Sequence, residues 1–168
     1  MPHSWLITGA GGQFGSVLLR KLVQQGRQAV GVVSPTGGEP FVGETRRVDV
    51  TDRDRLADVV RALRPDIIVH AAAITAIEAA YRDPAKAERT NVAATEQLAE
   101  LAQEVGARLV FISTDLVFDG TCPPYDEQSA PRPLSGYGRS KAEAEQVVRR
   151  YERAIVIRPP LMYGLPAA

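Results

Sequence analysis

Short apolar runs that alternate with amphipathic stretches are the feature of this sequence that most constrains its fold. The runs lie at residues 5–8, 29–33, 46–50, 66–70, 109–113 and 154–158. Most of them are apolar at nearly every position rather than at every second one, which is typical of strands buried on both faces. The pattern therefore predicts an α/β fold, a doubly wound parallel sheet of the Rossmann type with right-handed crossovers.

The stretches between these runs have helical periodicity. Residues 16–25 carry an apolar stripe closed by Gly26, and a second stripe runs from the polar TDRDR segment to Leu63. Two longer helices are predicted over residues 85–105 and 140–151, with a Pro-rich loop at 122–133 between them. A chain of 168 residues has the size of one domain, and by analogy with Rossmann folds we expect the strand order 3-2-1-4-5-6.

A glycine-rich turn joins the first predicted strand to the first predicted helix. It reads GAGGQFG, and Gly9, Gly12 and Gly15 have the spacing G-x-x-G-x-x-G. Glycine allows positive φ and leaves no Cβ in the way, so N–H groups at a helix N-terminus can approach a pyrophosphate. Such turns can also serve only to pack a helix on a strand, but this position in an alternating pattern favours dinucleotide binding.

The end of the second predicted strand differs from the usual NAD-binding pattern. That pattern has a carboxylate that binds the ribose 2′-hydroxyl, whereas this sequence reads Val32-Val33-Ser34. Ser34 can bind either a hydroxyl or a 2′-phosphate, and Arg46 or Arg47 could assist. The sequence therefore leaves NADP and NAD open as the cofactor, with NADPH slightly favoured.

A tyrosine and a lysine lie at the start of the last predicted helix. Their four-residue spacing puts Tyr137 and Lys141 on one helical face, and Thr114 follows the preceding strand. A phenol normally loses its proton near pH 10, and a neighbouring ammonium group lowers that pKa. Alone, the pair would more simply be a helix surface, but beside a dinucleotide turn it indicates hydride transfer coupled to proton transfer.

Together these stretches resemble the extended short-chain dehydrogenase/reductase family, which is marked by G-x-x-G-x-x-G and Tyr-x-x-x-Lys. Within it, the most similar group is that of the dTDP-4-dehydrorhamnose reductases. The stretches that carry the resemblance are LITGAGGQFG, VDVTD, RPDIIVHAAAITAIEAA, ISTDLVFDGTCPPYDE, PLSGYGRSKAEAE and RPPLMYG. They follow the family's order over essentially the whole chain. The resemblance implies NAD(P)-dependent reduction of a keto group on a nucleotide-activated sugar.

The resemblance also implies roles for individual residues. Tyr137 would donate the proton when a keto group is reduced, and Lys141 would lower its pKa and bind the nicotinamide ribose. Thr114 would hydrogen-bond the reacting oxygen, with Asp115 near the substrate. The other residues implied in cofactor binding are Gly9, Gly12, Gln13, Phe14, Gly15, Ser34, Asp49, Val50, Ala71, Ala72, Ala73, Asn91, Ser113, Pro159 and Pro160. For Asn91, packing within a helix is an equal alternative.

Several positions depart from the group's pattern. Leu161 stands where rhamnose-type reductases commonly have a tryptophan in the sugar pocket. Val17 stands where some members have an acidic residue linked to metal-assisted dimerisation. Leu116 stands where many sugar dehydratases have an acid, which argues against dehydratase or epimerase chemistry, a close alternative. His70 replaces the asparagine usual in the reductases, and we interpret it as a structural histidine. Asp49 and Asp115 could simply cap turns or helices instead of binding ligands.

The resemblance also bears on domain organisation. Extended members of the family continue well beyond the RPxxxYG motif, and that part builds most of their substrate-binding domain. Because this sequence stops at LPAA, we interpret residues 1–168 as the NAD(P)-binding domain and the chain as a fragment. A regulatory subunit of methionine adenosyltransferase also resembles the reductase group, so a non-catalytic, cofactor-binding subunit is an alternative function.

The composition of the chain limits the kinds of binding partner that we expect. Lys plus Arg and Asp plus Glu are equal at 20 each, so no net charge favours nucleic acid or anionic lipid. Cys122 is the only cysteine and cannot form an internal disulfide, no Cys/His cluster has metal-ligand spacing, and the first apolar run is too short to span a membrane. We expect a cytoplasmic protein with a small-molecule substrate, no metal, no nucleic acid and no membrane partner. A homodimer stays open.

Overall fold

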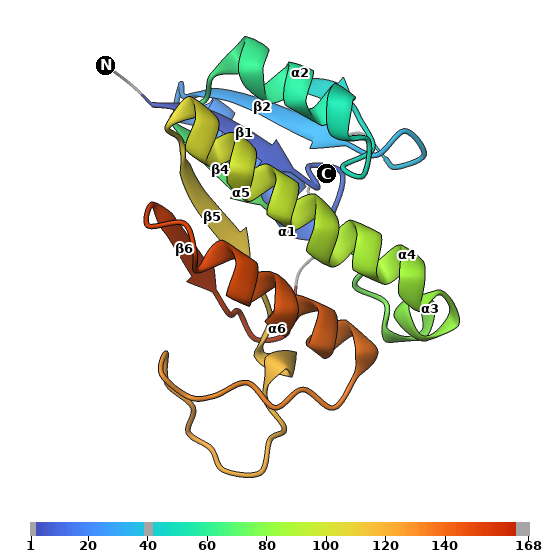
Figure 1. Cartoon of the computed structure of the whole chain (residues 1–168). Coiled ribbons are helices and arrows are strands. Elements are labelled where there is room, and N and C mark those ends of the chain that lie inside the picture. The colour runs from blue at the N-terminus through green and yellow to red at the C-terminus, as the bar shows by residue number, and fades with distance from the viewer. Residues whose placement is uncertain (1–2, 39–41, 164–168) are drawn as a thin grey trace.

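A parallel six-stranded sheet forms the centre of the computed structural model, which describes residues 3–38 and 42–163 (Figure 1). The strands are β1 (Ser4–Thr8), β2 (Gln28–Val33), β3 (Glu44–Arg47), β4 (Ile67–His70), β5 (Arg108–Ile112) and β6 (Ala154–Ile157). Their order is β3-β2-β1-β4-β5-β6, and each neighbouring pair is parallel. The predicted Rossmann-type sheet and its strand order are confirmed.

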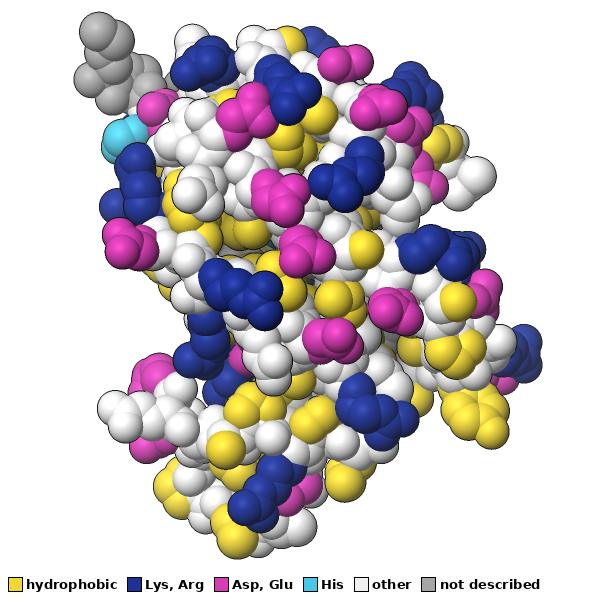
Figure 2. All heavy atoms as spheres, in the orientation of Figure 1, with side chains coloured by type: hydrophobic (Ala, Val, Ile, Leu, Met, Phe, Trp, Pro, Cys, Tyr) yellow, Lys and Arg dark blue, Asp and Glu magenta, His cyan; other side chains and the backbone are white. Residues whose placement is uncertain are grey.

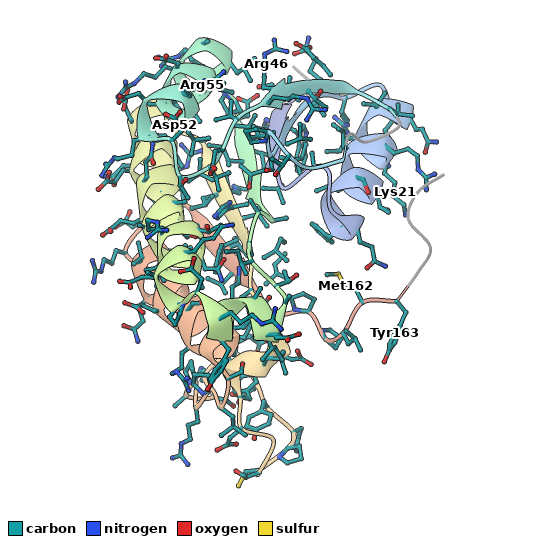
Figure 3. All side chains as sticks on the ribbon, turned by 90° about the vertical axis from the view of Figure 1, so that its right-hand side faces the viewer. Lys21, Arg46, Asp52, Arg55, Met162 and Tyr163 are labelled. Atoms are coloured by element: carbon teal, nitrogen blue, oxygen red, sulfur yellow. The ribbon has the colours of Figure 1, made fainter. Side chains whose placement is uncertain are left out.

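The helices cover the two faces of the sheet unequally. They are α1 (Gln13–Gln24), α2 (Arg53–Leu63), α3 (Ile77–Arg82), α4 (Pro84–Glu88), the π-helical η1 (Arg89–Ala93), α5 (Ala94–Val105), the 3₁₀-helical η2 (Asp115–Val117) and α6 (Gly136–Val148). Figure 3 shows α1 on one side of the sheet and α2, α5 and α6 on the other. Within the described ranges, no helix is both long and apolar enough to span a membrane.

Each face of the sheet has its own apolar core, because successive strand residues point to opposite sides. Leu6 and Phe111 belong to the core under α2, α5 and α6, where Leu98 of α5 is fully buried. Their neighbours Ile7 and Ile112 belong to the core under α1. At the β6 edge, Ile155 and Ile157 lie on the α1 side but remain 48% and 43% exposed, because α1 covers only the strands nearer β2.

Salt bridges join the two helices above β2 and β1 on their solvent side. Arg61 of α2 pairs with Glu104 of α5 through two hydrogen bonds of 2.8 and 2.9 Å, and Arg53 contacts Glu100 at 3.2 Å. Figure 2 shows Lys, Arg, Asp and Glu side chains interspersed over this face. Because these pairs are exposed, each contributes little to stability.

The structure corrects several predicted boundaries. Strand β3 ends at Arg47 rather than at residue 50, because Asp49 turns the chain: its carboxylate accepts hydrogen bonds from the N–H and the hydroxyl of Thr51. Helix α6 begins at Gly136 rather than at residue 140, since the Ser135 hydroxyl caps it by accepting from the N–H of Gly138 at 2.9 Å.

The helix predicted over residues 85–105 exists, but a π-helical segment interrupts it. It comprises α4, η1 and α5 in succession, and neither Gly nor Pro marks the change within it. The helices α3 and η2 were not predicted. Both are short, and their sequences have too few residues to establish a periodicity.

Candidate active site

A pocket of about 890 Å³ opens where the carboxyl ends of the strands meet. This is where ligands bind in open parallel sheets. The pocket gathers eighteen of the predicted site residues: Gly9, Gly12, Gln13, Phe14, Gly15, Ser34, Asp49, Val50, Ala71, Ala72, Ala73, Ser113, Thr114, Asp115, Tyr137, Lys141, Pro159 and Pro160. Asn91 does not line it. The predicted residues thus line one pocket wall built from the ends of all six strands.

The glycine turn fits closely against β4 and against itself. Gly9 has a φ of +71°, and a Cβ there would lie 2.7 Å from the backbone of Ala71. A Cβ on Gly15 would lie 2.3 Å from the carbonyl oxygen of Gly9. Only glycine fits at these two positions, so they bring the N-terminus of α1 down onto β1.

Gly12 has a different part in the turn. A Cβ there would meet only the oxygen of Gly9, at 3.3 Å, so packing does not demand glycine as strictly. Gly12 is the N-cap of α1 and has no side chain to cap it, and the first turn contains no acidic residue. An uncapped helix N-terminus on a pocket wall favours a bound anion. The cradle therefore fits the pyrophosphate of a dinucleotide.

Tyr137 lies in the first turn of α6 and is only 8% exposed. Burial raises the pKa of its phenol, a hydrogen bond with Thr114 acts in the opposite direction, and Asp115 raises it further. Lys141 is not among the groups that act on this pKa here, and burial decides its direction. Tyr137 consequently keeps its proton at neutral pH, as a proton donor must.

Thr114 caps the short helix η2 beside this phenol. Its hydroxyl accepts from the N–H of Leu116 at 3.2 Å and donates to the carboxylate of Asp115 at 3.2 Å. These contacts, one with a backbone N–H and one with a side-chain carboxylate, hold the Thr114 side chain at the pocket wall. The leucine at position 116 also lines the pocket, where a dehydratase-type acid was considered.

Lys141 is almost fully buried, at 1% exposed. Its ammonium donates to the carbonyl of Ile112 at 2.7 Å and lies 3.9 Å from the ring centroid of Phe111. Burial lowers the pKa of Lys141 to about 7, and the carboxylate of Glu145 acts against this shift. The charge of Lys141 is therefore easily changed near neutral pH.

His70 is held by two threonines behind the pocket wall. Its Nδ1 lies 2.6 Å from the Thr8 hydroxyl and its Nε2 lies 2.9 Å from the Thr95 hydroxyl. Because Thr95 donates its own proton to the carbonyl of Asn91, it accepts from Nε2–H, and Thr8 donates to Nδ1. Burial, with Lys141 nearby, lowers the pKa of His70 to about 3. These contacts agree with a structural histidine.

Asn91 supports the pocket from behind instead of lining it. Its side-chain oxygen accepts from the N–H of Ile74 at 2.8 Å, and its amide nitrogen donates to the Ile74 carbonyl and to the Ser140 hydroxyl. With its side chain engaged in this way, Asn91 ties the loop after β4 to α6. The helix-packing alternative describes these contacts better than cofactor binding.

The two arginines considered near the ribose lie outside the set of pocket residues. Arg47 donates to the carbonyls of Ser34, Pro35 and Gly37, and thereby shapes the loop after β2. Arg46 pairs with Glu44 on the edge strand. Sequence reasoning missed Lys86 and Thr90, which line the pocket from one helical face. Their four-residue spacing was the available signal.

Comparison with known protein families agrees with this arrangement of the pocket residues. The sequence pattern of the family described as RmlD substrate binding domain matches residues 3–167. The chain belongs to this family. The resemblance to the extended short-chain dehydrogenases/reductases and to their RmlD-like group is thereby confirmed.

Individual members of the family are similar over almost the whole chain. The methionine adenosyltransferase 2 subunit beta of Xenopus laevis is 35% identical over 160 residues, which are 95% of this chain and 47% of that protein. The dTDP-4-dehydrorhamnose reductase of Aggregatibacter actinomycetemcomitans is 33% identical over 161 residues, again 95% of this chain and 51% of the reductase. The chain thus spans about half the length of these relatives.

A solved structure of a reductase has the same fold over almost the whole chain. The dTDP-4-dehydrorhamnose reductase of Bacillus anthracis in complex with NADP superimposes with a TM-score of 0.84 at 32% identity. The match covers 97% of this chain and 55% of that reductase. The described chain therefore corresponds to one half of an RmlD-family protein.

Proposed function

We propose that this chain is the cofactor-binding part of an NAD(P)-dependent reductase that acts on a keto group of a nucleotide-activated sugar. The observation that carries the proposal is the single pocket shared by the glycine turn and by Thr114, Tyr137 and Lys141. Membership of the RmlD family, with dTDP-4-dehydrorhamnose reductases among its relatives, supports this substrate class.

The pocket residues suit a nicotinamide dinucleotide along its whole length. The α1 N-terminus at Gly12 would hold the pyrophosphate, Asp49 and Val50 would flank the adenine, and Pro159 and Pro160 would line the nicotinamide. When bound, the reduced nicotinamide would supply the hydride. NADP is slightly favoured over NAD, because Ser34 lines the pocket where a carboxylate would oppose a 2′-phosphate.

Side chains of the protein would donate the proton that the reduction requires. Tyr137, whose buried phenol is protonated at neutral pH, would donate its proton to the substrate oxygen as the keto group becomes a hydroxyl. Thr114 would hydrogen-bond the same oxygen. Lys141 would bind the ribose and, by its positive charge, stabilise the phenolate left after proton transfer.

Most contacts that select the sugar would come from outside residues 1–168. The relatives are about twice as long, and Leu161 occupies the wall where the rhamnose-type tryptophan is expected. We therefore assign residues 1–168 to the NAD(P)-binding domain and leave the particular sugar undefined.

A second candidate function is that of a non-catalytic regulatory subunit. The observation that favours it is the similarity to methionine adenosyltransferase 2 subunit beta, at 35% identity over 160 residues. Intact site residues fit this function too, since a subunit can bind the cofactor without turning over a substrate.

Titration of the full-length protein with NADPH and NADH, followed by an assay of cofactor oxidation with keto-sugar nucleotides, separates the two functions. The reductase predicts binding and turnover. Binding with no turnover across such substrates would favour the regulatory subunit. Absence of any thermal stabilisation by either dinucleotide would contradict both, because binding at a hundred times the dissociation constant adds ~2.7 kcal/mol.

A further inference from the structure

Glu145 lies in a buried polar cluster behind the candidate active site. Its side chain is 1% exposed and accepts two hydrogen bonds from Nε of Arg158, at 2.9 and 3.2 Å, and one from Nη2 at 2.6 Å. The Ser113 hydroxyl donates to Oε1 of the same carboxylate at 2.5 Å. A buried carboxylate with this many donors holds its position firmly, because each hydrogen bond to a charged group is strong.

The cluster joins the three elements that carry the catalytic candidates. Glu145 is on α6, the helix of Tyr137 and Lys141. Ser113 directly precedes Thr114, and Arg158 directly precedes Pro159. Backbone hydrogen bonds reinforce the same junction: Ser113 N–H donates to the Ile157 carbonyl at 2.7 Å, and Asp115 N–H donates to the Pro159 carbonyl at 3.1 Å.

We propose that Glu145 is a positioning residue: through Ser113 and Arg158 it fixes α6 at the pocket, and its negative charge lies one helical turn from the buried ammonium of Lys141, which it attracts. This inference rests on the proposed function only for its consequence in catalysis. The electrostatic effect of Glu145 on Lys141 can be tested in the 168-residue chain without any substrate.

The electrostatic part follows from the surroundings of Lys141. Glu145 comes one helical turn later on the same face, and it raises the pKa of Lys141 against the lowering by burial. The charge of Lys141 also lowers the pKa of His70 on β4. With a pKa of about 3, His70 stays neutral near pH 7. On the pocket side lie Tyr137, protonated at neutral pH, and Asp115, which acts on that phenol.

Arg158 partly neutralises the negative charge of Glu145 and so weakens the effect of that charge on Lys141. Two of its nitrogens bind the carboxylate, whereas Nη1 is buried without a hydrogen-bond partner among the described residues. The guanidinium also lies 4.9 Å from the ring centroid of Phe118, and Arg149 approaches Glu145 at 3.9 Å. Removal of Glu145 alone would therefore leave Arg158 buried and unpaired, so a variant that removes both charges is needed as well.

The test is the titration of Lys141 by NMR, in a chain with ¹³C-labelled lysine. Lys21 and Lys86 supply the other signals, and Lys141→Arg assigns the buried one. We expect Glu145→Gln to move the midpoint of Lys141 to lower pH by about one unit or more, the effect of losing an adjacent opposite charge. Glu145→Gln/Arg158→Met should show a smaller downward shift, because it lacks the carboxylate but also lacks the guanidinium charge that repels the ammonium of Lys141.

The matched control is Glu143→Gln, an exposed position on the same helix, which should leave the midpoint of Lys141 unchanged. A merely structural role for the cluster would lower the melting temperature of the Glu145 variants and leave the Lys141 midpoint where it is. If both Glu145 variants are folded and titrate Lys141 like the wild type, the inference is wrong.

The experiments distinguish failure of the proposed reductase function from failure of the inference about Glu145. A chain that binds neither NADPH nor NADH would contradict the reductase, while the Lys141 titration would still report on Glu145. Where turnover is present, Glu145→Gln should move the basic limb of its pH profile to lower pH, since Lys141 then loses its charge at lower pH. An unchanged basic limb would overturn the catalytic consequence of the inference.

Discussion

The buried histidine of β4 makes the stability of this fold depend on pH in a calculable way. The pKa of His70 falls from its ordinary 6.5 to about 3 in the folded chain, because the ring is fully buried and Lys141 is near. Between these two pH values the unfolded chain binds a proton at His70 and the folded chain does not. Stability is thus complete above pH 6.5 and declines as the pH falls toward 3.

The expected size of the effect follows from these two values. One pKa unit corresponds to about 1.36 kcal/mol, and pH 5 lies 1.5 units below the ordinary value of 6.5. His70 therefore removes about 2 kcal/mol of folding free energy between pH 7 and pH 5. His70→Asn eliminates this contribution, so the free-energy difference between the wild type and this variant should change by about 2 kcal/mol in the variant's favour.

Urea unfolding at pH 5, 6 and 7, followed by circular dichroism, measures this difference. Carboxylates such as Asp119 and Asp126 titrate in both proteins, so their contributions cancel in the comparison. His3→Asn, at an exposed position, serves as the control and should follow the wild type. If the wild type and His70→Asn lose stability in parallel from pH 7 to pH 5, the claim that His70 stays neutral between its two threonines is refuted.

Substitutions at the glycine turn and at a helix cap test packing separately from binding. Gly15→Ala should lower the unfolding free energy by about 1–3 kcal/mol in urea denaturation, despite a gain in helix propensity, because its Cβ would lie 2.3 Å from the Gly9 oxygen. Gly12→Ala, with a contact of 3.3 Å, should cost less stability than Gly15→Ala but weaken dinucleotide binding in a fluorescence titration; equal losses of stability would contradict the packing argument. Asp52→Ala removes the cap that accepts from Arg55 N–H and should cost about 1 kcal/mol in thermal unfolding without affecting dinucleotide affinity; an unchanged melting temperature would show that this cap is dispensable.

The fold could be predicted because its signals are local and repeated. Apolar runs such as Leu6–Ile7 and Phe111–Ile112 divide between two buried cores, and a parallel sheet is the arrangement that buries both faces. The errors occurred where a single side chain decides a boundary. Ser135 starts α6 four residues early, which no hydrophobic periodicity reveals.

The site was predictable as far as strand ends define it. Residues that follow strands must gather at one edge of a parallel sheet, so the pocket could be assembled in outline from the glycine turn, Thr114 and Tyr137. Burial was the missing information. It raises the pKa of Tyr137, and the role proposed for Glu145 in GYGRSKAEAE depends on long-range contacts with Ser113 and Arg158.

The central claim is that Tyr137 donates a proton during reduction of a keto sugar by NAD(P)H. Its most direct test is the rate of NADPH oxidation by the full-length protein with a dTDP-4-keto sugar, compared between wild type and Tyr137→Phe. We expect turnover in the wild type and a loss of about 10²–10⁴-fold in the variant, which should still bind NADPH. Equal turnover by the two proteins would contradict the assignment of Tyr137.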